Sequence, residues 1–291
     1  MQTVFDTLVA AKKCYERVYF RPNSGNAGDA LINVGFYSIA KKICLEYEEI
    51  SDDFPYEKLS ERDLVVLSGG GNIVSYWSAG SALVQRLTQY KFPLLLMPQS
   101  IEGREDILGL LRERDVLFLR EKYSFEYACA LGLKCSLALD SDLAFFVDLT
   151  LFGAACRVLP ALSIRNVRKM AYVFWHCLRS KMTGRLVALR TDRESVTLGR
   201  KRKFNDISLV AKFGTRDREL NMLSAYWLLK VLSWYDVVET DRLHVFVGCV
   251  LVGTKVILHE NAYYKIKGVY EYSVRAHPAY APLVQLANNV R

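Results

Sequence analysis

The amino-acid sequence predicts an α/β protein built from two units that each contain a parallel sheet. Short, continuous apolar runs alternate with helical patterns through the first 150 residues, and the alternation resumes after residue 185. Apolar strands of this continuous kind are typical of parallel sheets that are covered on both faces. A chain of 291 residues, 51% of them apolar, suits one large or two smaller domains with a sizeable core.

The expected elements of the first half alternate between strand and helix. A short strand at 18–21 leads into a Pro/Asn/Ser/Gly loop, after which Asp29 is expected to be the N-cap of a helix over 29–44. A buried strand at 63–68 runs into three glycines, and a second one at 93–97 is expected to end at Pro98. The other expected elements are a helix at 78–90, a strand at 116–120, a helix at 122–131 and a strand at 135–139.

The second half repeats this style after a basic, irregular or helical stretch at 147–183. We expect strands at 186–190, 236–239 and 255–259, helices at 216–233 and 242–252, and a tyrosine-rich helix near 262–274. The predicted organisation is therefore an N-terminal domain (1–150), a basic connecting segment (151–185) and a C-terminal domain (186–291). One continuous sheet is the alternative.

The net charge of +8 is concentrated in one segment. Residues 157–203 contain 13 basic and 2 acidic residues, a net charge of +11, so the rest of the chain carries −3. This imbalance indicates a local anionic partner, either a membrane surface, a phosphorylated substrate or nucleic acid.

Targeting and redox signals are weak in this chain. No apolar run approaches the ~18–20 residues that span a bilayer, and the first residues lack the pattern of a signal peptide. The seven cysteines form no CxxC pair, so we expect reduced, mostly buried thiols and a cytoplasmic protein.

Three polar loops are expected at the carboxyl edge of the first sheet, where open α/β sheets bind ligands. They are the stretches 23–29, 68–72 and 97–100, and two of them are rich in glycine and asparagine. Glycine lets a backbone approach a ligand closely, and exposed N–H groups at a helix start favour an anionic or polar ligand. A tight turn with a helix cap explains the first loop equally well.

The second half offers an arginine–histidine pair at a strand-to-helix junction. Arg242 and His244 can both lie in the first turn of the expected helix, where the arginine can bind an anion and the histidine can move a proton. Arg190 ends a strand at the corresponding edge, with a surface ion pair as the alternative. His176 and His277 are expected to be structural.

The segment 168–182 has an amphipathic helical pattern. Apolar residues including Phe174, Trp175 and Leu178 share one arc, and Arg168, Lys169, His176 and Arg179 share the other. An interfacial helix on an anionic membrane has this pattern, and so does an ordinary helix packed on a core.

Taken together in chain order, these pieces resemble the polysaccharide pyruvyl transferase family. The resemblance spans residues 25–268 and is specific as an ordered set rather than in any one motif. Its pieces are Gly25-Asn26-Ala27-Gly28-Asp29, Ser68-Gly69-Gly70-Gly71-Asn72, Pro98-Gln99-Ser100, Leu119-Arg120-Glu121 with Ser124, Asp142-Leu143-Ala144-Phe145, Leu189-Arg190, Thr240-Asp241-Arg242-Leu243-His244, and Lys265 before Gly268.

The resemblance implies two Rossmann-like domains that face each other across a cleft, as in glycosyltransferase-B enzymes. It implies transfer of the pyruvyl group of phosphoenolpyruvate onto a sugar of a cell-surface or exopolysaccharide precursor, with no other cofactor and no metal. By motif, the catalytic residues would be His244, Arg242 and Asp29. The donor would be held by Arg190, Arg242, His244 and Lys265, and the acceptor by Asn26, Asp29, Gly70, Gly71, Asn72, Gln99 and Ser100.

The expected partners are phosphoenolpyruvate, a saccharide acceptor carried on a lipid, and an anionic membrane that the protein contacts peripherally from the cytoplasmic side. A glycosyltransferase-B-type sugar transferase that uses a nucleotide sugar is the first alternative. A module that grips nucleic acid through 157–203 is the second, but no motif for reading nucleic acid accompanies the basic residues. We therefore expect no nucleic-acid partner.

Overall fold

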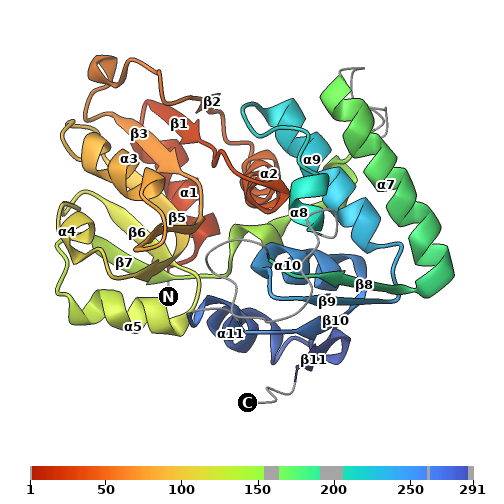
Figure 1. The fold of residues 1–291 in the computed structure, drawn as a ribbon. Coiled ribbons are helices and arrows are strands. Elements are labelled where there is room, and N and C mark those ends of the chain that lie inside the picture. Colours follow the sequence, from red (N-terminus) through yellow and green to blue (C-terminus); the bar gives the residue numbers. More distant parts are fainter. Residues whose placement is uncertain (1, 154–163, 191–205, 261–262, 288–291) are drawn as a thin grey trace. The chain divides into compact units, whose positions relative to one another are not determined.

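The structure of the protein is a computed structural model that describes residues 2–153, 164–190, 206–260 and 263–287 (Figure 1). Its contacts divide the chain into two compact units. Unit 1 comprises Met1–Asn23 and Gly35–Val147, and unit 2 comprises Ser24–Val34 and Asp148–Arg291. The described strands form two separate sheets whose ladders are parallel. The predicted α/β fold with Rossmann-like parallel sheets is thus confirmed, and the alternative of one continuous sheet is wrong.

Unit 1 contains a seven-stranded sheet in the order β2-β1-β3-β5-β6-β7, with β4 also paired to β5. Every residue of β3 and all but the last of β5 are buried, because helices or loops cover both faces of the sheet. The elements are α1 Val4–Cys14, β1 Arg17–Arg21, α2 Ala27–Lys42, β2 Glu48–Glu49, β3 Asp63–Leu67, β4 Gly70–Val74, α3 Ala79–Leu87, β5 Leu94–Glu102, α4 Glu105–Leu108, β6 Val116–Leu119, α5 Lys122–Ala130 and β7 Ser136–Leu139.

Strand β5 continues through Pro98, so the prediction that it ends there is wrong. Its first half pairs with β3, as in Leu96 beside Leu67, and its second half pairs with β4, as in Gln99 beside Gly70. Pro98 lies where β5 changes partner and where its register with β6 shifts. A proline is tolerated at such an irregularity because the ladder does not need its missing N–H there.

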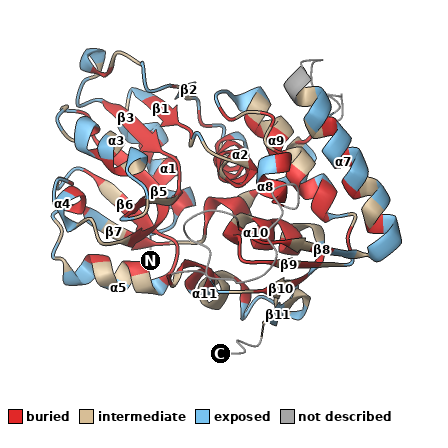
Figure 2. Cartoon of the chain, in the orientation of Figure 1, coloured by how far each residue is buried: buried red, intermediate tan, exposed pale blue. Residues whose placement is uncertain are grey.

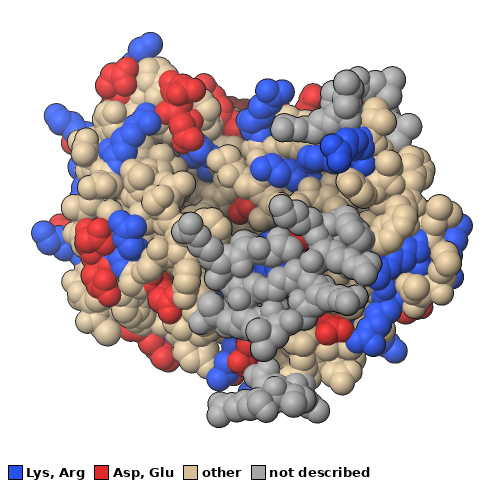
Figure 3. Space-filling view, in the orientation of Figure 1, with Lys and Arg blue, Asp and Glu red and all other residues tan. Residues whose placement is uncertain are grey.

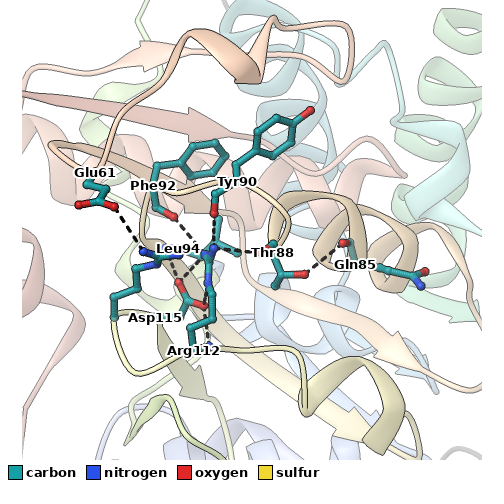
Figure 4. Close-up of polar contacts among 9 residues, drawn as sticks. Glu61, Gln85, Thr88, Tyr90, Phe92, Leu94, Arg112 and Asp115 are labelled. Carbon is teal, nitrogen blue, oxygen red and sulfur yellow. Dashed lines mark hydrogen bonds and ion pairs between the residues drawn. The ribbon is translucent and has the colours of Figure 1, made fainter.

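The start of β5 is fixed by Arg112 at the amino edge of the sheet (Figure 4). Its guanidinium donates to the main-chain oxygens of Thr88, Tyr90 and Phe92 and to both carboxylate oxygens of Asp115. Asp115 in turn accepts from the N–H of Leu94 at 2.9 Å. All five guanidinium N–H groups are used, so this arginine is a structural brace.

Unit 2 contains a four-stranded sheet in the order β11-β10-β9-β8. Strand β9 lies between β8 and β10, with Thr240 beside both Ala188 and Leu258. The elements are α7 Ile164–Thr183, β8 Arg185–Ala188, α8 Ile207–Val210, α9 Arg218–Leu232, β9 Val237–Thr240, α10 Leu243–Val252, β10 Lys255–Leu258, α11 Lys265–Val269 with a π-helical turn at Tyr270–Val274, and β11 Val284–Leu286.

Helix α7 packs one face on unit 2 and leaves the other exposed (Figure 2). Met170, Val173 and His176 lie on the buried face. The prediction that His176 shares the polar arc is wrong, because its ring is fully buried and its Nδ1 lies 2.8 Å from the hydroxyl of Tyr235. As expected, this histidine is structural.

The described cysteines are all free thiols. Cys135 and Cys249 are buried, whereas Cys14, Cys44 and Cys129 are exposed, so the expectation of mostly buried thiols is wrong. In the parts of the chain that the structure describes, no helix is both long and apolar enough to cross a membrane. The basic run 200–203 lies outside the described residues.

Candidate functional site

The first turn of α2 forms a closed capping arrangement. The side-chain oxygen of Asn26 accepts from the N–H of Gly28 at 2.7 Å, and Oδ2 of Asp29 accepts from the N–H of Asn26 at 2.8 Å. Asn26 is therefore the cap, and the prediction that Asp29 is the N-cap is wrong. Asp29 lies three residues later, and its carboxylate holds the N–H of the cap residue. Its Oδ1 accepts no hydrogen bond from the described residues, and the side chain is partly exposed.

Gly28 is packed directly against His244, the second residue of α10. A Cβ atom on Gly28 would lie 2.7 Å from Cβ of His244 and 3.0 Å from its Nδ1. Only glycine fits without displacing the imidazole, so this glycine sets where the ring lies. Of the two interpretations that the sequence left open, the structure shows the turn with a helix cap, and it adds a close contact between two helix starts within unit 2.

A buried hydrogen bond further anchors the first half of α2 in unit 2. The side-chain amide of Asn33 donates to Oδ1 of Asn221 on α9 at 2.9 Å, and neither side chain is exposed. Residues 24–34 accordingly belong to unit 2 by their contacts. The predicted first domain included Asn26 and Asp29, but both belong to unit 2, where their neighbour Gly28 packs on His244.

The carboxyl edge of the second sheet brings the two predicted arginines level with each other. Ala188 of β8 pairs with Thr240 of β9, so Arg190 and Arg242 each lie two residues beyond a paired position. The N–H of Arg190 donates to Oδ1 of Asp241 at 2.7 Å. The hydroxyl of Thr240 donates to the oxygen of Ala188 and accepts from the N–H of Arg242 at 3.0 Å. Thr240 and Asp241 thus brace the two backbones that carry the arginines.

Arg242 forms a buried ion pair with Asp206, a residue that the sequence analysis missed. The guanidinium donates to Oδ2 of Asp206, whose Oδ1 accepts from the hydroxyl of Ser208 at 2.7 Å. Asp206 is fully buried and Arg242 is 6% exposed. No local signal identifies Asp206, because it lies far from Arg242 in the sequence and precedes a short helix.

Lys265 is the first residue of α11, and it is almost fully buried. Its Nζ lies 4.9 Å from the centroid of the Tyr263 ring, a cation–π distance. A separate cavity of about 360 Å³ in unit 2 is lined by residues of α11, the π-helical turn and the strand ends, among them Lys267, Tyr270 and Arg275. None of the predicted site residues lines that cavity.

The carboxyl edge of the second sheet gathers charges of both signs. Arg190 and Arg242 lie level at this edge, and two acids accompany them, because Asp206 pairs with Arg242 and Asp241 accepts from the N–H of Arg190. Helix α10 starts at the same edge, and its residue His244 is partly exposed.

In unit 1, the predicted second loop is in large part a strand, since Gly70, Gly71 and Asn72 belong to β4. The prediction of a free loop is wrong here, and packing explains the glycine before the strand. A Cβ on Gly69 would lie 2.7 Å from the main-chain oxygen of Pro98. Asn72 packs against Gly80 at the start of α3, where a Cβ would lie 2.6 Å from it. Gly71 and Asn72 remain partly exposed.

Gln99 and Ser100 lie beneath this strand in a buried polar network. The amide of Gln99 donates to the oxygen of Ser68 at 2.8 Å, and its Oε1 is buried with no partner among the described residues. Arg120 donates to the hydroxyl of Ser100 and to Asp142, at 2.8 and 2.7 Å.

The remaining carboxylate of this network is Glu121, the N-cap of α5, which accepts from the N–H of Ser124 at 2.9 Å. Burial raises the pKa of Glu121 above its ordinary value, against the hydrogen bonds from Ser124 that lower it. Ser100, Asp142 and Glu121 have no exposed surface. These motif residues therefore form the framework of unit 1, and we do not carry Ser100 into an acceptor site.

Among the described residues, no group of three or more His, Cys, Asp or Glu side chains comes together in a way that could hold a metal ion.

The fold defines a parallel α/β protein, and the carboxyl edge of its second sheet carries Arg190 and Arg242 together with Asp206 and Asp241. The chain belongs to the polysaccharide pyruvyl transferase family, whose model matches residues 26–261. Among solved structures it is similar to the crystal structure of a functionally uncharacterized protein from Klebsiella pneumoniae, with 26% identity and a TM-score of 0.75. That match covers 97% of this chain and 96% of the other. The comparison with curated proteins found no match.

Proposed function

We propose that the protein transfers the pyruvyl group of phosphoenolpyruvate onto two hydroxyls of one sugar in a cell-surface or exopolysaccharide precursor. Membership of the family supports pyruvyl transfer. The observation that supports phosphoenolpyruvate as the donor is the level placement of Arg190 and Arg242 at the ends of β8 and β9, directly before the start of α10 with His244. In this proposal the arginines bind the anionic groups of the donor, and His244 supplies the proton.

The donor carries a carboxylate and a phosphate, and both need cationic or N–H partners. Arg190 and Arg242 stand level at the ends of β8 and β9 and supply planar guanidinium groups suited to such anions. Lys265 supplies a further positive charge at the start of α11. Asp206 holds the guanidinium of Arg242 in place, so we assign it a positioning role.

In the proposed reaction, a sugar hydroxyl adds to the central carbon of phosphoenolpyruvate and loses its proton to a base. The methylene carbon gains a proton and becomes a methyl group. Phosphate then leaves with the electrons of its C–O bond, and the second hydroxyl attacks the resulting cation. Its proton leaves with the phosphate, and the product is a cyclic ketal.

His244 is the proposed acid that protonates the methylene carbon or stabilises the departing phosphate. It is partly exposed, and its position is set by Gly28. Asp29 is the proposed base. One of its oxygens is engaged by the N–H of Asn26, which leaves Oδ1 to accept a proton from a sugar hydroxyl.

The proposed acceptor is a saccharide carried on a lipid. The residues proposed to bind it come from the family resemblance, and they are Asn26, Asp29, Gly70, Gly71, Asn72 and Gln99. Partial exposure of Asn26, Asp29, Gly71 and Asn72 supports this assignment.

The test is release of inorganic phosphate from phosphoenolpyruvate in the presence of saccharide acceptors, with detection of the ketal by mass spectrometry. Thermal shift with phosphoenolpyruvate and with nucleotide sugars runs in parallel. We expect selective stabilisation by phosphoenolpyruvate, which is lost in Arg190→Ala. For the variant His244→Ala, the matched control is His277→Ala, because His277 is exposed and stacks on Tyr280. If a nucleotide sugar stabilised the protein and nucleotide were released in the assay, the function would be sugar transfer instead of pyruvyl transfer.

A further inference from the structure

The outward face of α7 is apolar, which is unusual for a helix that already buries its opposite face. Its most outward side chains recur at the helical spacing of three or four residues. They are Val167, Ala171, Phe174, Leu178 and Met182, and we call them the outer stripe. Leu178 is 63% exposed and Met182 is 83% exposed. The buried face is separate and is formed by Met170, Val173, His176 and Ser180.

Cations flank the outer stripe on both sides. Arg168 and Arg179 lie along one side of it, and Lys181 lies along the other. The twenty residues of α7 include five Lys or Arg and no Asp or Glu. Figure 3 shows Lys and Arg side chains beside uncharged ones over the C-terminal half of this helix.

Two further aromatic residues of α7, Tyr172 and Trp175, lie beside the stripe. Trp175 and Tyr172 are both 39% exposed, and the guanidinium of Arg179 lies 5.0 Å from the Trp175 ring. Amphipathic rings and long basic side chains are what a helix places at the boundary between lipid tails and headgroups, where the apolar part enters and the charge stays in water.

We propose that the outer stripe of α7 docks the protein on the surface of an anionic lipid bilayer. An apolar line with two arginines along one side and a lysine on the other, on a helix without any acid, matches acyl chains beneath negatively charged headgroups. A second copy of this chain fits less well, because two such helices face to face would bring like charges together. The docking is a surface contact, because the described residues contain no helix that could cross a membrane.

The test is co-sedimentation of the full chain with vesicles, which measures binding without turnover and so does not depend on the proposed pyruvyl transfer. Vesicles of phosphatidylcholine alone are compared with vesicles that also contain phosphatidylglycerol, at low and at high salt. We expect binding to the anionic vesicles only, weakened by salt. Equal binding to both vesicles, or none to anionic vesicles at low salt, would overturn the proposal.

Two double variants separate the contributions of charge and stripe. Arg168→Gln with Lys181→Gln should lower the vesicle partition coefficient about thirtyfold, from the usual contribution of a cation near an anionic surface. Leu178→Gln with Met182→Gln should lower it about tenfold or more. The matched controls are Lys13→Gln with Lys41→Gln, and Leu110→Gln, all at exposed positions of unit 1. The controls should bind as the parent does.

Each variant changes exposed side chains, so its thermal unfolding should match that of the parent. Tryptophan emission should shift to the blue on anionic vesicles, and Trp175→Phe should remove that shift. Unchanged binding by the stripe variant would contradict the proposal. The proposal would also be contradicted if sedimentation velocity showed that the stripe variant loses a stable dimer while its vesicle binding is unchanged.

Discussion

The stretches 25–29 and 68–72 share glycine and asparagine, but their glycines face different kinds of neighbour. Gly69 fits against the main-chain oxygen of Pro98, inside a sheet. Gly28 fits against the side chain of His244, where two helices begin. Gly69 lets two stretches of backbone pack closely, which the fold requires. Gly28 leaves room for a partly exposed, titratable ring and so determines where that ring lies.

The comparison extends to the polar groups around each stretch. Beneath 68–72, Ser100 and Glu121 are fully buried and hydrogen-bonded to their neighbours. Beside 25–29, Asp29 and His244 keep exposed surface. Buried networks specify a structure, while partly exposed titratable groups next to helix starts can act on a ligand. We therefore propose that the acid–base chemistry lies at the first stretch, and that the buried residues next to the second stretch serve the fold.

Replacement of His244 gives the largest expected effect. His244→Ala should lower turnover about 10²–10⁴-fold, because a positioned proton donor is lost. The temperature of unfolding should change little, because the ring is partly exposed. Phosphate release and calorimetry measure the two effects. Near-normal turnover of His244→Ala would show that His244 has no catalytic role. The proposed difference in role between the stretches 25–29 and 68–72 would then fail as well.

Replacement of Arg242 should destabilise the protein strongly. Arg242→Ala leaves Asp206 buried without the arginine that pairs with it, and breaking a buried pair costs about 3–5 kcal/mol. Urea unfolding measures the loss. The double variant with Asp206→Ala should recover part of it, because no buried charge remains unpaired. Equal stability of the single variant and the parent would mean that the pair contributes little, and Arg242 would then be held by other contacts.

The two glycines provide the direct test of the comparison. Gly28→Ala should push the His244 ring aside and lower turnover about 10²-fold, the scale expected for misplacement by about 1 Å. Its stability should fall less, because alanine favours the helix. Gly69→Ala should lower the free energy of unfolding by about 1–3 kcal/mol through overpacking against backbone, with normal turnover per folded molecule. Lost turnover in Gly69→Ala together with a mainly structural effect of Gly28→Ala would contradict the proposed roles of the two stretches.

Local patterns in the sequence predicted most of the strands and helices of both sheets, and most boundaries fall within a few residues. Helix α1 was missed although its signal is present, a capping box from Thr3 to Asp6. Strand β4 was missed because Gly70 and Gly71 resemble a loop in any local pattern. The short strands β2 and β11 and the short helices α4 and α8 were also missed, because two to four residues give little periodic signal.

The partners within the site could not be predicted from local patterns. Gly28 meets His244 and Asp206 meets Arg242 across long stretches of sequence. The residues 24–34 also precede most of unit 1 in the chain, yet they pack in unit 2. The sequence indicated which residue types carry the chemistry, but tertiary packing decides which of them meet.

The pH dependence of Glu121 gives the smallest expected effect and tests the scaffold below 68–72. Burial raises the pKa of this carboxyl in the folded protein, so the folded state holds the proton to a higher pH than the unfolded chain does. Its contribution to stability is fully present below the ordinary glutamate value and is lost as the pH rises through the raised pKa. Urea unfolding at a series of pH values should show this decline, and Glu121→Gln should flatten it, because the amide does not titrate. The hydrogen bond from the N–H of Ser124 can be kept by the amide oxygen, so the variant should still fold. An unchanged slope in Glu121→Gln would show that Glu121 does not titrate in this window, and that the network of unit 1 holds it charged.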